Sequence, residues 1–247
     1  MEKEAQYGAA RASIAYRAAA LAVGTLYRLG DYDPHIPLRL TSSGLNNLPH
    51  NEPYILAYAH HNSWDIPTLG TVVHRSTRRP VHFMAKYELL EDGSRWGRLL
   101  NAMHALPVQR GQTTREQIRN AIDVLEQGEI LGIAAEGGRI DGDRVGDIQG
   151  GAGYIATHAN VETVPVGVAG VNWRFRGRNL PYVPRSIHIH FSKPIIPLGP
   201  TRQDREEVNQ QIAASLQASL DQSYHYYGMI HGKKASSRLD TGLTKLF

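Results

Sequence analysis

Two histidines and an aspartate lie close together in the segment from Ala59 to Pro67. A histidine can act as a general base when a carboxylate orients its ring and stabilises the charged form. Positions five apart on one helix differ by about 140° around its axis, so His60 and Asp65 would not meet there. They can meet if His60 lies in a turn and Asp65 in the first turn of a helix. Such a pair is more often structural than catalytic, and His61 is a second candidate base.

Two further segments combine glycine with arginine, which is typical of sites for anions. Glu136-Gly137-Gly138-Arg139 follows an apolar run, and its glycines let the backbone approach a ligand and expose its N–H groups. Arg139 can hold a phosphate through two hydrogen bonds. Arg110-Gly111 precedes a capped helix and also suits an anion, while Pro165 lies at the start of an apolar strand. Taken one at a time, these segments are equally explained by tight turns, a solvated arginine and a sheet edge.

The elements that must position these residues alternate between strands and helices. This alternation predicts an α/β fold, a single domain in which helices flank a mostly parallel sheet. His60 and Glu136 each follow an apolar strand, where such folds place their sites. The predicted strands are 38–41, 54–59, 82–85, 130–134, 163–168 and 187–191. The predicted helices are 5–29, 64–73, 95–104, 113–127, 150–158 and 205–224.

Residues 1–30 are expected to form an N-terminal amphipathic helix. Its apolar run from Ala18 to Tyr27 falls short of the roughly 20 residues that a spanning helix needs. Glu2 and Glu4 do not fit the basic start of a signal peptide. Two roles remain open for this helix: it lies on a membrane surface, or it docks on the core of the protein. One stripe of the helix holds Ile14, Ala18, Leu21 and Thr25.

Composition narrows the function classes. The 247 residues are 41% hydrophobic, which is ordinary for a globular protein, and the absence of cysteine excludes thiolate chemistry and disulfides. The net charge of +4 is too small for a dedicated nucleic-acid-binding protein, so no nucleic-acid partner is expected. A mild basic excess suits an anionic membrane surface or a phosphorylated substrate as well as a merely solvated surface.

Taken together and in this order, the segments resemble the glycerolipid acyltransferase family, whose best-known members are the lysophosphatidate acyltransferases. His60, four residues and then Asp65 match the first block of that family, and Arg110-Gly111 matches the second. Glu136 to Arg139 matches the third block, with Gly138 where the family usually has threonine. Val164-Pro165-Val166 matches the fourth. The resemblance extends from about residue 36 to residue 200.

The resemblance implies transfer of a fatty acyl group from a thioester to a hydroxyl of a lysophospholipid. The donor would be acyl-CoA or acyl carrier protein, as a co-substrate, with no cofactor and no metal. The most direct acceptor is 1-acylglycerol-3-phosphate, which would give phosphatidate. The family pattern makes His60, not His61, the general base that Asp65 orients. It assigns acceptor binding to Arg110, Gly111, Glu136, Gly137, Gly138, Arg139 and Pro165.

The sequence also leads to expectations about the division of the chain and its place in the cell. Residues 31–224 would form the acyltransferase domain, and residues 225–247 a polar C-terminal tail. The protein would be cytoplasmic and peripherally associated with the membrane. Three alternatives stay open: an acyltransferase for another lysophospholipid or a glycolipid, a metal-dependent hydrolase, and a lipid-binding module without catalysis. In the hydrolase, His60, His61, Asp65 and His104 would hold the metal.

Overall fold

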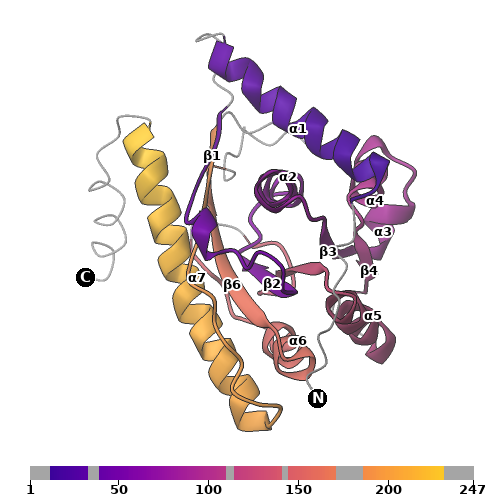
Figure 1. The fold of residues 1–247 in the computed structure, drawn as a ribbon, viewed down its shortest axis with the longest axis vertical. Helices are drawn as coiled ribbons and strands as arrows, with labels where there is room; N and C mark the ends of the chain where they lie inside the picture. The colour runs from indigo at the N-terminus through magenta and orange to yellow at the C-terminus, as the bar shows by residue number, and fades with distance from the viewer. Residues whose placement is uncertain (1–11, 33–38, 110–113, 141–143, 171–185, 231–247) are drawn as a thin grey trace, which may run out of the picture.

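The computed structural model describes residues 12–32, 39–109, 114–140, 144–170 and 186–230. Its strands form one seven-stranded sheet in the order β1-β7-β6-β2-β5-β3-β4 (Figure 1). All neighbouring strands are parallel except β6 and β7, which are antiparallel. The predicted α/β class with a mostly parallel sheet is therefore confirmed. The strands are β1 (Arg39–Ser43), β2 (Tyr54–Tyr58), β3 (Val81–Lys86), β4 (Leu106–Val108), β5 (Ile130–Ala134), β6 (Glu162–Ala169) and β7 (Ser186–Phe191).

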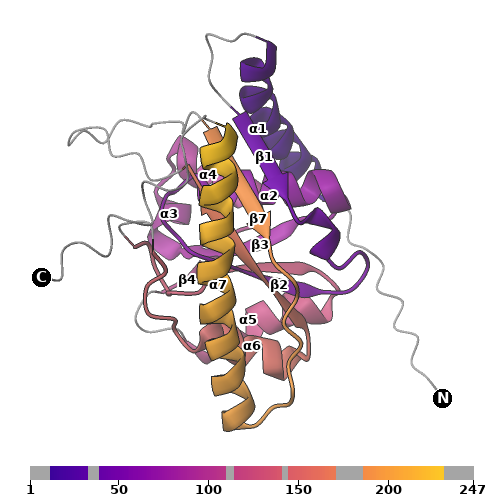
Figure 2. The same ribbon diagram turned by 90° about the vertical axis from the view of Figure 1, so that its left-hand side faces the viewer.

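Helices cover both faces of the sheet. Side chains of α1, α2 and α4 pack on one face, and those of α5, α6 and α7 pack on the other. Figure 2 shows α7 running across the second face, where it contacts β6 and β7. The helices are α1 (Ile14–Tyr32), α2 (Asp65–Thr77), α3 (Tyr87–Glu91), α4 (Arg95–Ala102), α5 (Arg115–Glu126), α6 (Gly151–Ala159) and α7 (Arg202–Ile230), with a short 3₁₀ turn at Leu45–Asn47.

The central strand β2 ends in the middle of the sheet. Its residues are buried on both faces, since alternate side chains enter the two opposite core clusters. From β2 the chain crosses through α2 to β3 on one side, and from β5 it crosses through α6 to β6 on the other. The connections therefore leave β2 and β5 in opposite directions, which opens a crevice at the carboxyl ends of these strands.

Helix α1 is docked on the domain and also presents an apolar outer face. The Tyr16 hydroxyl donates to the carbonyl of Gly70 at 3.3 Å and accepts from the N–H of Val81 at 3.0 Å. On the opposite side Ile14 is 79% exposed and Leu21 is 68% exposed. The stripe expected from the sequence is thus the outward one. The buried side of the helix is made by Ala12, Tyr16, Ala19, Ala20, Val23 and Tyr27.

Several elements differ from the sequence-based expectation. The sequence did not predict the 3₁₀ turn, the five-residue helix α3 or the three-residue strand β4, which are too short to show periodicity. Helix α7 continues to Ile230, so residues 225–230, expected to begin the polar tail, are helical. Residues 231–247, the rest of that expected tail, lie outside the described residues.

Pro165 lies within β6, an interior strand, and not at a strand start or sheet edge. A proline cannot donate a hydrogen bond to the ladder, which usually confines it to edges and bulges. Here Val166 pairs with residue 191 and Thr163 pairs with residue 195, so the partner segment has one extra residue between the pairs. That β-bulge beside Pro165 accounts for a proline in the sheet interior.

Candidate active site

The structure brings His60 and Asp65 together at the carboxyl end of β2. His60 lies in the turn after the strand, and Asp65 is the first residue of α2. The Nδ1 atom of His60 is 3.0 Å from Oδ2 of Asp65. The break between strand and helix therefore allows the contact that a continuous helix would forbid, as the sequence predicts.

The Asp65 carboxylate is fully buried and held by the turn that it follows. Its Oδ2 atom also accepts hydrogen bonds from the backbone N–H groups of His61 and Asn62, each at 2.9 Å. A carboxylate can only accept, so the proton of a neutral His60 ring sits on Nδ1. That tautomer leaves the lone pair of Nε2 free to take a proton from another molecule. The ring is further oriented by Tyr58, whose ring packs edge-on at 5.8 Å between centroids.

The Glu136–Gly138 loop lies directly after β5, beside the His60 turn. One carboxylate oxygen of Glu136 accepts from the N–H of His60 at 3.1 Å, and the other accepts from the N–H of Gly146 at 3.3 Å. Gly137 has a φ of 69°, a left-handed conformation that favours glycine. The loop is joined to the same turn by the N–H of Ile140, which donates to the His60 carbonyl at 2.8 Å.

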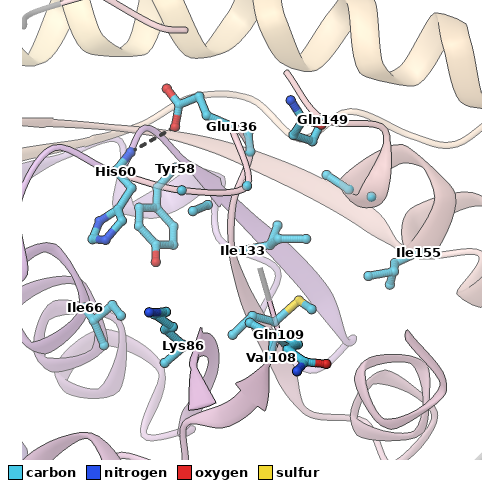
Figure 3. A pocket seen from close by; sticks show the side chains of 18 of the residues that line it. Tyr58, His60, Ile66, Lys86, Val108, Gln109, Ile133, Glu136, Gln149 and Ile155 are labelled. Atoms are coloured by element: carbon cyan, nitrogen blue, oxygen red, sulfur yellow. Dashed lines mark hydrogen bonds between the residues drawn. The ribbon is translucent and has the colours of Figure 1, made fainter. Parts of the chain in front are cut away.

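A cavity of about 460 Å³ opens in front of His60. Its volume and largely apolar wall with a few polar groups are typical of small-molecule sites. In Figure 3 His60 and Lys86 lie toward one end and Ile155 toward the other. The apolar wall is formed mainly by Ile66, Met84, Val108, Ile118, Ile133 and Ile155. The other lining residues include His60, Lys86, Gln109, Gln149, the glycines 137, 138, 150 and 151, and Glu136.

Lys86 is a cavity residue that the sequence-based site assignment left out. It ends β3 and places an ammonium group near His60, where it also pairs with Glu88 at 3.2 Å. The segment containing Lys86 resembles the family stretch between its first two blocks, and that was the available signal. The N-terminus of α6 borders the same cavity at Gly150 and Gly151, and its dipole adds positive potential.

The predicted acceptor-binding residues do not all meet in this cavity. Gly137 and Gly138 line it together with Glu136. Arg139 is exposed and Pro165 is buried in β6, and neither is among the described residues that form its wall. Arg110 and Gly111 lie outside the described residues. Binding of the acceptor by these residues stays a prediction.

The four ligands proposed for a metal hydrolase do not converge. His104 donates or accepts through Nε2 at 2.8 Å from the Ser13 hydroxyl, and its ring packs against Tyr16 and His82. Burial lowers the pKa of His104, and neighbouring His82 lowers it further. Within the part of the chain that the structure describes, no group of three or more histidine, aspartate or glutamate side chains could hold a metal ion.

A buried histidine–aspartate pair at the carboxyl end of a parallel strand, facing a cavity, defines a candidate general-base site on an α/β fold. Residues 39–169 match the model of the Acyltransferase family, which is more than half of the chain. The chain therefore belongs to this family. The expected family is thereby confirmed.

One curated protein and one solved structure are similar to the chain. Over 125 residues, the chain is 33% identical to a 1-acyl-sn-glycerol-3-phosphate acyltransferase from Bacillus subtilis (strain 168). That match covers 50% of this chain and 59% of the relative, so the chain spans less than two thirds of that protein. The crystal structure of PlsC, the 1-acyl-sn-glycerophosphate (LPA) acyltransferase from Thermotoga maritima, is similar with a TM-score of 0.57. The superposition covers 82% of this chain and 81% of the PlsC chain, with 18% sequence identity. At this identity the similarity is one of fold.

Proposed function

We propose that this protein transfers a fatty acyl group from a thioester to the free hydroxyl of 1-acylglycerol-3-phosphate, with His60 as the general base. The observation that carries the proposal is the 3.0 Å contact between His60 and the buried Asp65 at the wall of the cavity. The name and 33% identity of the Bacillus subtilis relative support the choice of acceptor.

The chemistry follows from the tautomer of His60. With its Nδ1 proton bonded to Asp65, the Nε2 atom removes the proton of the acceptor hydroxyl. The hydroxyl oxygen attacks the carbonyl carbon of the thioester, the carbon–sulfur bond breaks, and the leaving thiol receives the proton from His60. No acyl-enzyme forms on the way. The buried carboxylate of Asp65 stabilises the transient imidazolium.

The cavity offers complementary surfaces for the two substrates. Lys86 and the N-terminus of α6 provide positive potential for the phosphate of the acceptor. The apolar wall that includes Ile133 and Ile155 suits an acyl chain. Acyl-CoA and acyl carrier protein both supply the thioester, and neither needs a metal or a bound cofactor.

We also propose that the outer face of α1 lies on the membrane that contains the acceptor. Ile14 and Leu21 project from this face, and the exposed Arg17 and Arg28 suit anionic head groups. Within the described residues, no helix is both long enough and apolar enough to cross a bilayer. The proposed association is therefore peripheral.

The test compares two neighbouring histidines in a thiol-release assay with lysophosphatidate and palmitoyl-CoA. His60→Ala should lower turnover by about 10² to 10⁴, the usual contribution of a general base. His61→Ala should retain most turnover, because among the described residues its imidazole bonds only the carbonyl of Arg144, at 3.4 Å. Near-normal turnover of His60→Ala would overturn the assignment. Mass spectrometry of products from a panel of lysophospholipids and glycolipids identifies the acceptor, and a pure binding module would release no thiol.

A further inference from the structure

Glu136 is a buried carboxylate whose hydrogen bonds all point to backbone. It is 8% exposed, and its two oxygens accept from the N–H groups of His60 and Gly146. One side chain thus joins the turn that carries the general base to the segment that follows the Glu136–Gly138 loop. Bonds between an ionised acceptor and N–H donors are among the stronger ones in proteins.

The carboxylate and the imidazole lie on opposite sides of the His60 backbone. In Figure 3 the ring of His60 points toward Ile66 and Lys86, whereas the Glu136 oxygens lie on the other side, with the dashed bond to the His60 nitrogen. Glu136 therefore contributes its stem to the cavity wall while its charge faces away from the cavity. A carboxylate aimed at the acceptor would instead repel its phosphate.

We propose that Glu136 is a positioning residue that fixes the backbone of His60 relative to the backbone of Gly146 and does not bind the acceptor. This inference rests on the proposed function, in which His60 is the base. Two other contacts run between the same segments: the N–H of Ile140 bonds the His60 carbonyl, and the ring of His61 contacts the Arg144 carbonyl. Glu136 alone holds both segments with one charged group.

Glutamine is not a conservative replacement at this position. Both atoms of the carboxylate accept from N–H groups, whereas a glutamine side chain presents one oxygen and one NH₂ group. Whichever way the amide turns, its NH₂ faces a backbone donor, either that of His60 or that of Gly146. Glu136→Gln keeps the volume of the side chain but loses one of the two hydrogen bonds to the backbone. The variant therefore separates the effect of hydrogen bonding from that of packing.

The strand itself supplies a matched control. Glu129 stands just before β5, as Glu136 stands just after it, and it is 9% exposed. Its partner is the ring of His82, with Oε2 and Nε2 2.8 Å apart, at the opposite end of the strand from His60. Glu129→Gln disturbs an equally buried carboxylate at a place without contact to the proposed base.

The experiment measures kcat, the KM for lysophosphatidate and the thermal midpoint for the wild type, Glu136→Gln and Glu129→Gln. Glu136→Gln should lower kcat by about 100-fold, as expected when a reacting group is misplaced by about 1 Å. Its KM for lysophosphatidate should stay within about twofold, because no substrate contact is lost. Glu129→Gln should lower the thermal midpoint and leave kcat near that of the wild type.

Other results overturn the inference. An unchanged kcat and KM of Glu136→Gln would mean that Glu136 is dispensable. A tenfold higher KM for lysophosphatidate at normal kcat would mean that Glu136 binds the acceptor. If Glu136→Gln does not fold, Gly146→Pro replaces it, since it removes the N–H that donates to Glu136 at 3.3 Å. A lower kcat at constant KM then supports the positioning role of Glu136, and an unchanged kcat overturns it.

His60→Ala, assayed alongside, separates the two proposals. An active His60→Ala protein overturns the proposed function, and with it the premise that Glu136 positions a general base. If His60→Ala is inactive while Glu136→Gln has the kcat of the wild type, only the positioning role of Glu136 is overturned.

Discussion

Replacing Asp65 by asparagine isolates the electrostatic part of the proposed base. The carboxylate accepts three hydrogen bonds at Oδ2, from the His60 ring and from the backbone of residues 61 and 62. An asparagine oxygen in that position can still accept all three, so the turn should keep its shape. The negative charge that stabilises the imidazolium is lost, and this should lower kcat by about 10³, or about 4 kcal/mol in the activation free energy.

Asp65→Ala is the companion variant, because it also removes the acceptor. Two backbone N–H groups in the turn then lose their partner, which should lower the free energy of unfolding by about 3 kcal/mol. Asp65→Asn should therefore unfold close to the wild type in urea, while Asp65→Ala unfolds at a lower concentration. Thiol release and urea titration of both variants supply the two measurements.

The results that would refute this reasoning are specific. An Asp65→Asn protein with kcat within tenfold of the wild type would mean that the carboxylate has a purely structural role. Equal unfolding free energies for Asp65→Asn and Asp65→Ala would mean that the hydrogen bonds to Oδ2 do not hold the turn.

Three further predictions concern stability, packing and chain length. Burial, together with neighbouring His190, lowers the pKa of His188 to about 4 from 6.5, so the folded state favours the neutral ring. The unfolded chain binds the proton first, and stability should therefore fall by about 2 kcal/mol between pH 7 and pH 5, measured by urea unfolding; a flat profile would contradict this. Gly132→Ala would place a Cβ against the Phe83 ring, closer than van der Waals contact allows, and should destabilise the fold by about 1 to 3 kcal/mol, visible as a lower thermal midpoint. Ile155→Ala should shift the preferred acyl-CoA toward chains longer by roughly two methylene groups, because it enlarges the apolar end of the cavity; an unchanged preference in a chain-length series would place the chain elsewhere.

The membrane proposal is tested by the outer face of α1. Leu21→Asp should weaken binding to anionic vesicles about tenfold, since burying a leucine is worth about 1.5 kcal/mol or more. Leu198 is similarly exposed at 63% but lies before α7, so Leu198→Asp is the matched control. Equal vesicle binding by the two variants would contradict a membrane contact through α1.

The sequence predicted the interior of this fold better than its margins. The predicted strand 130–134 coincides with β5, and 54–59 closely matches β2, because strands buried on both faces are continuous apolar runs. The capped start of α5 was also visible, with Thr114 and Gln117 forming a capping box. Strand β4 was missed because three residues containing a proline show no periodicity.

The candidate site was predicted in part for a similar reason. The His60–Asp65 contact is local, spanning five residues, so the spacing and a strand-to-helix break suffice to expect it. The bond from Glu136 to the His60 backbone joins residues far apart in sequence, and it depends on how the two loops after β2 and β5 lie side by side. The predicted strand 82–85 ends next to Lys86, but the position of Lys86 at the cavity depends on residues far away in the sequence.

Helix α1 belongs to the folded domain, because one of its two faces packs on the core. Tyr16 bonds both Gly70, on the helix that starts with Asp65, and Val81, at the start of β3. The inner side of α1 also places Val23 and Tyr27 in the hydrophobic core. A chain shortened to start at residue 31 would therefore lose core packing as well as the proposed membrane contact. Helix α1 is a structural part of the folded domain, so only single substitutions on its outer face can separate the proposed attachment to lipid from folding.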